Sequence, residues 1–373
     1  MKVSRRSLVP PFQVMSILSR VAELRARGRD VISLCVGEPS GGAPPDVHKQ
    51  AARQHEQLEA LGYTGALGLT ELRQAVAEHY RAWYELDVAP ESVAITTGSS
   101  GAFVLAFLAA FDVGDKVALA SPGYPAYRNI LSALGCEVVE LECDVETRFQ
   151  PTPGLLDAAL AEHGTISGLI VASPANPTGT MLHRSELDAV ATWCHEHDVR
   201  LISDEIYHGI TYPIEGQPAS DARGVCAWEL ADHPVVVSSF SKYWGMTGWR
   251  LGWALVPPDL LPRVDALAGN VSLCPPTPAQ YAALGAFADE SYRFADERIA
   301  SFAQTRSLVL EKVSALGWGP VAPAEGAFYL YAGLGRQLGG HADSVSWCKA
   351  LLEEAGVALV PGVDFDPFHG GDY

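Results

Sequence analysis

Short runs of Val, Ile, Leu and Ala alternate along the chain with longer segments in which apolar residues recur at helical spacing. Five runs end in a turn of glycine and polar residues, and they occupy residues 93–96, 117–120, 169–172, 201–203 and 235–237. Such runs predict buried strands, and the segments between them predict helices. Their alternation predicts an α/β fold whose mostly parallel sheet has helices on both faces. Because ligands bind such sheets beyond the carboxyl ends of the strands, the polar turns mark the expected site.

The last of these runs leads into Ser239 and Lys242, and Arg250 follows eight positions later. The amine of a lysine at the end of a buried strand readily loses its proton and condenses with an aldehyde. The fixed charge of Arg250 suits a phosphate group. Most lysines that follow a strand are simply solvated, so the assignment of Lys242 depends on the other turns.

The turn after the first run suits an anion. Gly98 and Gly101 permit a tight backbone turn, and Ser99 and Ser100 supply hydroxyl groups. The apolar helix expected next points its free N–H groups at this turn. A helix N-cap without a ligand is the alternative, and a phosphate site is favoured if the residues around Lys242 join it.

Asp204 directly follows the fourth run, where a buried carboxylate needs a partner. A protonated pyridine nitrogen would satisfy it and would become an electron sink. Tyr207 and Asn176 could donate to the phenolic oxygen of such a ring, and Tyr124 could stack on its face. The alternatives are a plain Asn-Pro turn for Asn176 and a core aromatic for Tyr124.

Composition narrows the class of protein. The 373 residues are 48% hydrophobic, which is enough for a large core and more than one compact domain. The formal net charge of −18 argues against nucleic acid or an anionic membrane as a partner. The apolar stretch 103–111 is too short to span a membrane, and we expect neither a transmembrane segment nor a secretory signal.

Seven cysteines are scattered without a Cys-x-x-Cys pair, and the eleven histidines lack the spacing of metal ligands. We therefore expect free thiols in a reducing cytoplasm rather than disulfides. We expect no metal site.

Together these segments resemble the class I/II aminotransferases, which are pyridoxal-phosphate-dependent enzymes of fold type I in the aspartate aminotransferase-like superfamily. The Asn-Pro-x-Gly and Ser-x-x-Lys elements are specific to that family when they occur together in this order. The resemblance covers nearly the whole chain, and its matching segments are 36–39, 62–65, 173–179, 203–207, 239–252, 325–329 and 359–362.

The resemblance implies pyridoxal 5'-phosphate as the cofactor, with Lys242 as the Schiff-base lysine and Asp204 as the partner of the pyridine nitrogen. Lys242, Asp204 and Tyr207 would be the catalytic residues. Gly37 and Asn176 would contact the substrate, an amino acid or a 2-oxo acid. The implied cofactor contacts are Ser99, Ser100, Gly101, Tyr124, Asn176, Asp204, Tyr207, Ser239, Lys242 and Arg250.

The family's layout implies a large cofactor-binding domain at 45–285, with a seven-stranded type of sheet. Residues 1–44 and 286–373 would form a small α+β domain that includes a long helix at 291–316. Tyr63 matches a tyrosine that reaches the phosphate of the neighbouring subunit, which implies a homodimer with shared active sites.

The chain departs from the family at its end. Family members usually follow the Leu-Val-Pro-Gly element at 359–362 with a strand that carries an arginine, and that arginine clamps the substrate carboxylate. This sequence stops at Tyr373, about where that strand should begin. Either the sequence is shortened at its C-terminus or the clamp is absent, and we expect shortening because the match runs up to the stop.

The expected activity is transamination, which moves an amino group between an α-amino acid and a 2-oxo acid. Lyases and synthases of the same fold and cofactor are the alternative, because similarity of fold alone does not settle the reaction. A non-catalytic, aminotransferase-like sensor is disfavoured, because residues 1–44 are too few for a DNA-binding domain and the chain is acidic. The amino donor stays open.

Overall fold

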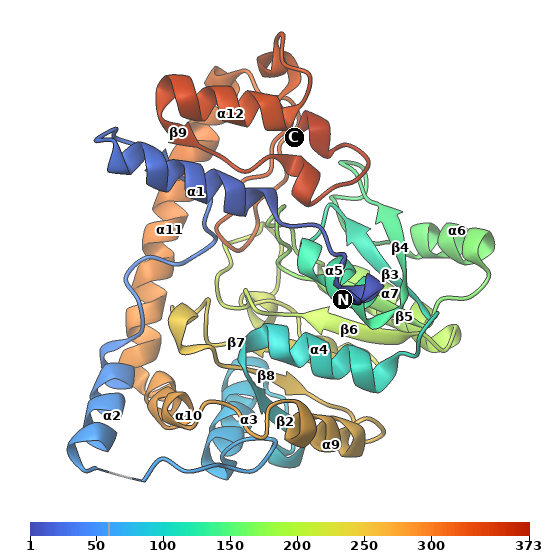
Figure 1. Cartoon of the computed structure of the whole chain (residues 1–373). Coiled ribbons are helices and arrows are strands. Elements are labelled where there is room, and N and C mark those ends of the chain that lie inside the picture. The colour runs from blue at the N-terminus through green and yellow to red at the C-terminus, as the bar shows by residue number, and fades with distance from the viewer. Residues whose placement is uncertain (59) are drawn as a thin grey trace.

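The computed structural model describes residues 1–58 and 60–373. A seven-stranded sheet lies at its centre, in the order β2-β8-β7-β6-β5-β3-β4 (Figure 1). Only β8 runs against the others, since it is antiparallel to both of its neighbours. The expected α/β fold with a mostly parallel sheet is confirmed, and the five apolar runs lie in β2, β3, β5, β6 and β7. The strands are β2 (Val93–Thr96), β3 (Lys116–Ser121), β4 (Glu137–Glu142), β5 (Gly168–Ala172), β6 (Arg200–Asp204), β7 (Val235–Ser239) and β8 (Gly252–Leu255).

Helices cover both faces of the sheet because successive strand residues point to opposite sides. In β6, Leu201 packs into one core and Ile202 into the other. The core around Ile202 is shared with α4 (Gly98–Ala110), α5 (Pro125–Leu134) and α9 (Leu261–Val271). The core around Leu201 is shared with α2 (Pro45–Glu56), α3 (Thr70–Tyr84), α6 (Pro153–His163), α7 (Arg184–Glu196), α8 (Ala227–Leu230) and α10 (Thr277–Ala283).

The strand register gathers the polar turns at one edge. Asp204, the last residue of β6, pairs with Ala172 at the end of β5 and with Val237 in β7. Ser239 at the end of β7 pairs with Gly252 at the start of β8. The turns after β5, β6 and β7 therefore leave the sheet side by side.

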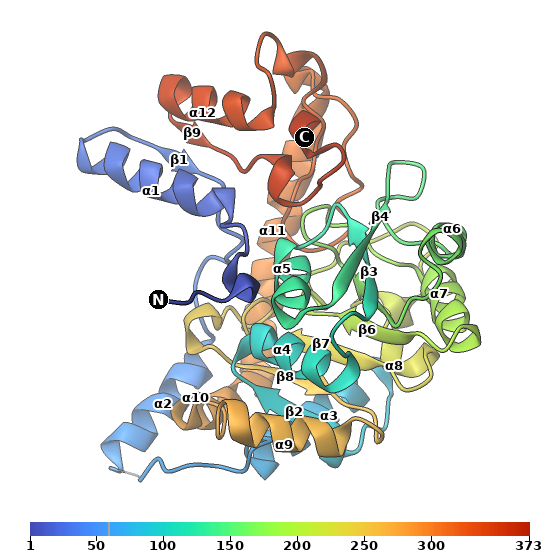
Figure 2. The ribbon, with the colours of Figure 1, turned by 45° about the vertical axis from the view of Figure 1, so that its right-hand side comes forward.

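Segments from both ends of the chain lie together above this edge, as Figures 1 and 2 show. β1 (Ile32–Ser33) pairs in parallel with β9 (Val357–Ala358), and α1 (Gln13–Ala26) shares a small apolar core with α12 (Ser344–Ala355). The long helix α11 (Asp289–Leu316) runs from the sheet-containing part to this layer and confirms the helix expected at 291–316.

Asp364 joins the two ends of the chain at a helix terminus. Its carboxylate oxygens accept hydrogen bonds from the backbone N–H groups of Gln13, at 3.0 Å, and Val14, at 3.2 Å. These groups open α1, where the first N–H groups have no partner inside the helix. Phe12, the N-cap residue, has no side-chain acceptor, so Asp364 provides the cap from 351 positions away.

Short 3₁₀ helices complete the described chain. Among residues 1–58 and 60–373, no helix is both long and apolar enough to cross a membrane. The same residues hold no group of three or more His, Cys, Asp or Glu side chains placed to bind a metal ion. The 3₁₀ helices are η1 (Arg5–Ser7), η2 (Pro90–Ser92), η3 (Ala219–Asp221), η4 (Thr247–Trp249), η5 (Leu284–Phe287), η6 (Gly335–Leu338), η7 (Gly362–Asp364) and η8 (Gly370–Asp372).

Candidate functional site

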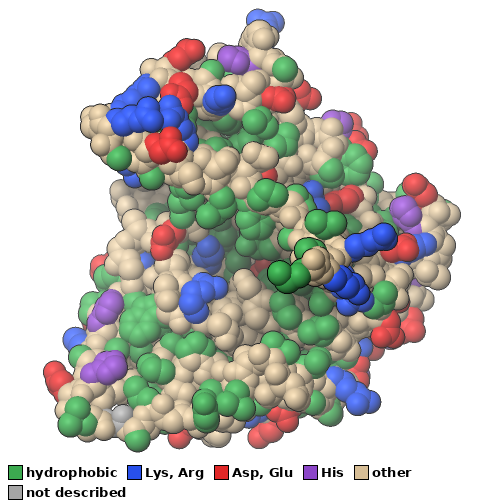
Figure 3. Space-filling view, viewed as in Figure 1, with side chains coloured by type: hydrophobic (Ala, Val, Ile, Leu, Met, Phe, Trp, Pro, Cys, Tyr) green, Lys and Arg blue, Asp and Glu red, His purple; other side chains and the backbone are tan. Residues whose placement is uncertain are grey.

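A cavity of about 410 Å³ opens at the edge of the sheet where the polar turns meet. Figure 3 shows this face of the molecule hollowed between the layer built from both chain ends and the sheet-containing part. Turns after the strands, the first turns of α4 and α5, and segments near both termini all line it. Of the residues expected at the site, the cavity brings together Gly37, Ser99, Ser100, Tyr124, Asn176, Asp204, Tyr207, Lys242 and Arg250.

Lys242 presents an amine of lowered basicity to the cavity. Burial disfavours its ammonium form and lowers its pKa to about 8, although the nearby carboxylates of Asp204 and Glu38 act in the opposite direction. The Nζ atom donates a hydrogen bond to the carbonyl oxygen of Gly37 at 2.7 Å. A pKa near 8 leaves part of the amine neutral around pH 7, which is the form that attacks an aldehyde.

Asp204 supplies a buried carboxylate to the same cavity. One of its oxygens accepts a hydrogen bond from the Tyr127 hydroxyl, and the other accepts one from the Ile206 N–H at 3.1 Å. Burial raises its pKa to about 6, against the effect of these bonds and of Lys242. A cationic ring nitrogen in the cavity would supply the charge that this carboxylate needs in order to stay ionised.

Glu205, the next residue, lies in a different environment, away from the cavity. Its carboxylate accepts hydrogen bonds from the Ala227 N–H at 2.7 Å and from the Ser203 hydroxyl at 3.1 Å. Glu205 does not line the cavity. The two adjacent acids are therefore separated by the alternation of the strand end.

Tyr207 and Tyr329 form a pair of hydroxyl groups at the cavity wall. The hydroxyl groups are hydrogen-bonded to each other, and burial raises the pKa of Tyr207 well above its ordinary value. Both phenols are therefore protonated and able to donate. A Cβ atom on Gly37 would overlap the Tyr329 hydroxyl, so any other residue at position 37 would displace Tyr329 from this position.

The other end of the cavity is suited to an anion. Gly98, at φ 68°, opens α4, and a Cβ atom there would lie 2.6 Å from a guanidinium nitrogen of Arg250. Among the described residues, the partner of the Arg250 guanidinium is a backbone carbonyl oxygen, that of Thr247 at 3.0 Å, and not a carboxylate. A guanidinium over the N-terminus of a helix, with the hydroxyls of Ser99 and Ser100 in the lining, is the donor set that phosphate binds.

Tyr124 and Asn176 complete the part of the lining that sequence analysis anticipated. Tyr124 is the N-cap residue of α5, and its ring meets that of Tyr127 edge-on at 5.4 Å between centroids. Asn176 lies in the turn after β5, the strand next to β6, and lines the same cavity as Asp204. An aromatic face, an amide, a buried carboxylate, an amine and an anion site thus fit a phosphorylated pyridine aldehyde.

Three expected contacts are placed outside this lining. Gly101 lies in the first turn of α4 behind the two serines. Ser239 is buried, and its hydroxyl donates to the Leu251 carbonyl oxygen at 3.3 Å and accepts from the Ser241 N–H at 3.0 Å. Tyr63 has an exposed fraction of 84% and lies in the loop before α3, where it lines another surface hollow.

Sequence analysis missed six polar residues of the cavity, namely Glu38, Tyr127, Ser241, Thr247, Tyr329 and Asp364. Tyr127 follows Tyr124 by three residues, which is one helical turn and could have signalled a second aromatic on the same face. Tyr329 ends a matching segment but received no role. Ser241 and Glu38 each adjoin a residue that was assigned.

Comparisons with known proteins show which family the chain resembles. The model of the family described as aminotransferase class I and II matches residues 29–366. A valine–pyruvate aminotransferase of Mycobacterium tuberculosis is 50% identical over 372 residues, which cover 100% of this chain and 92% of that protein. An aspartate/prephenate aminotransferase of Thermus thermophilus is 34% identical over 369 residues, which cover 98% of this chain and 92% of that protein.

Solved structures give the same result. The crystal structure of an aminotransferase from Mycobacterium tuberculosis has a TM-score of 0.93 and 50% sequence identity, covering 100% of this chain and 93% of that one. The structure of the aspartate aminotransferase from Thermus thermophilus with maleate has a TM-score of 0.89 and 33% identity, covering 98% and 92%.

Proposed function

Because the chain belongs to the family of class I and II aminotransferases, which are pyridoxal-phosphate-dependent enzymes, we propose that Lys242 and Asp204 hold pyridoxal 5'-phosphate in this cavity. The chain is an aminotransferase that moves an amino group between an amino acid and a 2-oxo acid. The observation that carries the assignment of the site is the presence of an amine of lowered pKa and a buried carboxylate in one cavity.

The proposed roles follow from the contacts. Bound pyridoxal phosphate supplies an aldehyde for the amine and a protonated ring that draws electrons from the substrate α-carbon. The Nζ of Lys242 would take the proton from that carbon and deliver it to the cofactor carbon that carried the aldehyde, as general base and then acid. The carboxylate of Asp204 holds the charge of the ring nitrogen, and Tyr207 and Asn176 donate to the phenolic oxygen.

The remaining residues hold the cofactor and the substrate. Tyr124 stacks on the ring, and Ser99, Ser100 and Arg250 bind the phosphate. Gly101 belongs to the same first turn of α4, and the Ser239 hydroxyl fixes the Ser241 N–H beside Lys242. The backbone at Gly37 lies over the substrate, and Asn176 contacts it as well. These roles are supported by the cavity lining and by the charge that Arg250 places at the N-terminus of α4.

We propose an amino acid with a small aliphatic side chain as the donor. The outer cavity is lined by apolar residues and by the carboxylates of Glu38 and Asp364, and Lys242 and Arg250 are the only cations in the described lining of the whole cavity. An acidic side chain would therefore lack a cationic partner beside these carboxylates. The relative with 50% identity is named a valine–pyruvate aminotransferase, which agrees with this donor class. The apolar residues of the outer cavity are Phe12, Val14, Val36, Ile130, Val360 and Phe365.

We further propose a homodimer in which Tyr63 of each protomer completes the phosphate site of the other. Its exposure of 84%, in a loop away from its own cavity, supports a role across an interface. The pairing of β1 with β9 supports a small domain made of residues 1–44 and 286–373 beside a large domain at 45–285. The seven cysteines are free thiols, which supports a reducing cytoplasm as the location.

Borohydride reduction tests the cofactor assignment. Reduction, digestion and mass spectrometry should find the cofactor on the peptide that contains Lys242, and Lys242→Ala should lose both the label and nearly all turnover. Lys49→Ala is the control, because Lys49 is an exposed lysine paired with Asp46. A label that persists in Lys242→Ala would refute the assignment.

A further inference from the structure

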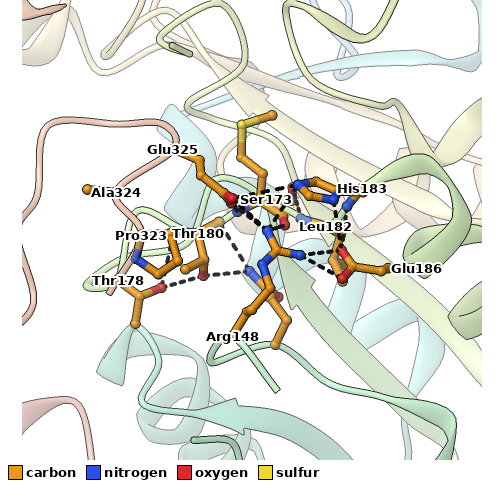
Figure 4. A network of polar contacts seen from close by, with 12 residues as sticks. Arg148, Ser173, Thr178, Thr180, Leu182, His183, Glu186, Pro323, Ala324 and Glu325 are labelled. Atoms are coloured by element: carbon orange, nitrogen blue, oxygen red, sulfur yellow. Dashed lines mark hydrogen bonds and ion pairs between the residues drawn. The ribbon is translucent and has the colours of Figure 1, made fainter. Parts of the chain in front are cut away.

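Arg148 lies between two carboxylates that come from distant parts of the chain (Figure 4). Its guanidinium donates to Glu186 at 2.6 and 2.8 Å and to Glu325 at 2.6 and 2.8 Å. It also donates to the carbonyl oxygen of Met181 at 3.1 Å. The Glu325 side chain is only 12% exposed, so the bonds to it are made with little competition from water.

The backbone at Arg148 adopts an unfavourable conformation that places its guanidinium between the two carboxylates. Arg148 has φ 54° and Phe149 has φ 57°, so two consecutive residues with side chains adopt the left-handed region. That region is unfavourable for residues other than glycine and persists only where surrounding contacts fix it. The next residue, Gln150, is buried and donates through Nε2 to the carbonyl oxygens of Ala172, at 3.2 Å, and Thr180, at 3.1 Å.

Glu325 belongs to a run that packs directly on the turn after β5. Its carboxylate accepts from the Met181 N–H at 3.0 Å, and the Gly326 N–H donates to the Gly179 carbonyl oxygen at 2.8 Å. A Cβ atom on Gly326 would lie 2.8 Å from the Cβ of Pro174. The run and the turn therefore meet without space for a side chain, and Arg148 contacts both of them.

Each of these two segments carries a residue of the cavity. The turn carries Asn176, and the run continues through Ala327, whose N–H donates to the Ile210 carbonyl oxygen at 2.8 Å, to Tyr329. The Tyr329 hydroxyl is hydrogen-bonded to that of Tyr207. Arg148 itself does not line the cavity, so any effect that it has on the cavity passes through these segments.

We propose that Arg148 is a positioning residue for the hydroxyl and amide groups that face the phenolic oxygen of the cofactor. Through Glu325 and Met181, it fixes the Glu325–Tyr329 run against the turn that carries Asn176. This fixes Asn176 through the turn that carries it, and Tyr207 through Tyr329. The inference rests on the proposed function, because it takes Asn176 and Tyr207 as the donors to that oxygen.

Arg184 provides a matched control. Its guanidinium is also shared by two carboxylates, Asp221 and Glu229, each at 2.7 Å. It joins α7 to η3 and α8, and none of these three residues lines the cavity. Arg184→Met therefore removes an equivalent pair of ion pairs without touching the two segments that Arg148 holds.

The first measurement follows the bound cofactor's absorbance as a function of pH in the holoenzyme. Donors to the phenolic oxygen stabilise its anionic form, so loosening them should raise the pKa of the lysine-bound chromophore. We expect this pKa to rise by about half a unit or more in Arg148→Met and to stay unchanged in Arg184→Met. In Arg148→Lys we expect a smaller rise, because lysine keeps the positive charge but lacks the planar guanidinium that bonds to both carboxylates. An unchanged pKa in folded Arg148→Met, or equal shifts in Arg148→Met and Arg184→Met, overturns the proposal.

The second measurement is hydrogen exchange in the cofactor-free protein. Peptides that contain the Gly326 and Ala327 amides should exchange about tenfold faster in Arg148→Met, and in Glu325→Gln should exchange faster than in wild type, with no change in Arg184→Met. Unchanged exchange overturns the inference even if the cofactor assignment holds. If wild-type protein shows no reducible bond at Lys242 while these amides respond as expected, the proposed function fails and the support by Arg148 stands.

Discussion

The Tyr127 hydroxyl donates a hydrogen bond to the carboxylate of Asp204 inside a fully buried pair. Tyr127 lies in the first turn of α5, and Asp204 is the last residue of β6. A helix on one face of the sheet therefore helps to keep the Asp204 carboxylate ionised. The hydrogen bond lowers the pKa of Asp204, which burial alone would raise further.

Tyr127→Phe should weaken the proposed ion pair between the Asp204 carboxylate and the ring nitrogen of the cofactor. Without the hydroxyl, the pKa of Asp204 rises and its negative charge becomes less available. A bond to a charged group contributes about 1.5–3 kcal/mol, so we expect kcat/KM to fall by roughly tenfold or more. Tyr124→Phe keeps the stacking ring and should lose far less. Steady-state kinetics compare the two variants, and equal losses would contradict the role of Tyr127.

Asp204→Asn should retain some cofactor, but its rate of proton abstraction should fall about a hundredfold or more because the ring nitrogen loses its anionic partner. Each tenfold step of that loss corresponds to about 1.4 kcal/mol. Glu205→Gln removes a neighbouring carboxylate that bonds to Ala227 and Ser203 instead, and it should mainly reduce stability. Single-turnover kinetics with thermal melts separate the two effects. The assignment is wrong if both variants lose proton abstraction to the same extent.

Cofactor capture should depend on pH through Lys242. Below its pKa of about 8 the amine is protonated and unreactive, and above that value it is neutral and attacks the aldehyde. The rate of incorporation into cofactor-free protein should therefore rise with pH, with a midpoint near 8. Asp204→Asn removes a charge that raises this pKa, so its midpoint should lie lower. A flat profile between pH 6 and about 9.5 would argue against a lysine of lowered pKa.

Donor specificity should favour aliphatic side chains. Because the outer cavity offers apolar walls and two carboxylates, we expect kcat/KM for valine to exceed that for aspartate by about a hundredfold, or roughly 2.7 kcal/mol. A panel of amino donors, scored by appearance of the cofactor's amine form, measures the ratio. A preference for aspartate would mean that a cation outside the described lining serves the side chain.

The shared-site proposal is tested by mixing subunits. Lys242→Ala and a severely impaired Tyr63 variant should each be inactive alone. A heterodimer of the two should regain one working site, because one cavity then holds both Lys242 and a Tyr63 from the other protomer. Native mass spectrometry confirms subunit exchange, and no gain of activity after confirmed exchange would remove Tyr63 from the site.

The residues at the site could be anticipated where a local pattern carries them. Lys242, Asp204 and the serine turn each follow an apolar run, and strand ends in a parallel sheet meet at one edge. β4 and β8 were not anticipated. β4 is the edge strand and contains three glutamates among its six residues, and β8 follows the lysine segment closely and reverses direction.

The supporting contacts could not be anticipated in the same way. Arg148 forms ion pairs with Glu186 and Glu325, which are 38 and 177 residues away in the sequence. No local sequence pattern predicts partners at such distances. Tyr329 was visible in a matching segment, but its bond to Tyr207 depends on how the run folds back over the turn after β5. Pairings of this kind are properties of the tertiary fold.

The cap that Asp364 places on α1 has a consequence for biosynthesis. The start of α1 leaves the ribosome long before residue 364 has been synthesised. Until then the first N–H groups of the helix lack the Asp364 carboxylate and are hydrogen-bonded to water. The sheet strands emerge in the meantime and can assemble the half of the cavity that holds Lys242 and Asp204. Phe12 and Val14 can then be fixed at the cavity only once residue 364 has emerged, so this part of the outer wall forms after the part that holds Lys242 and Asp204.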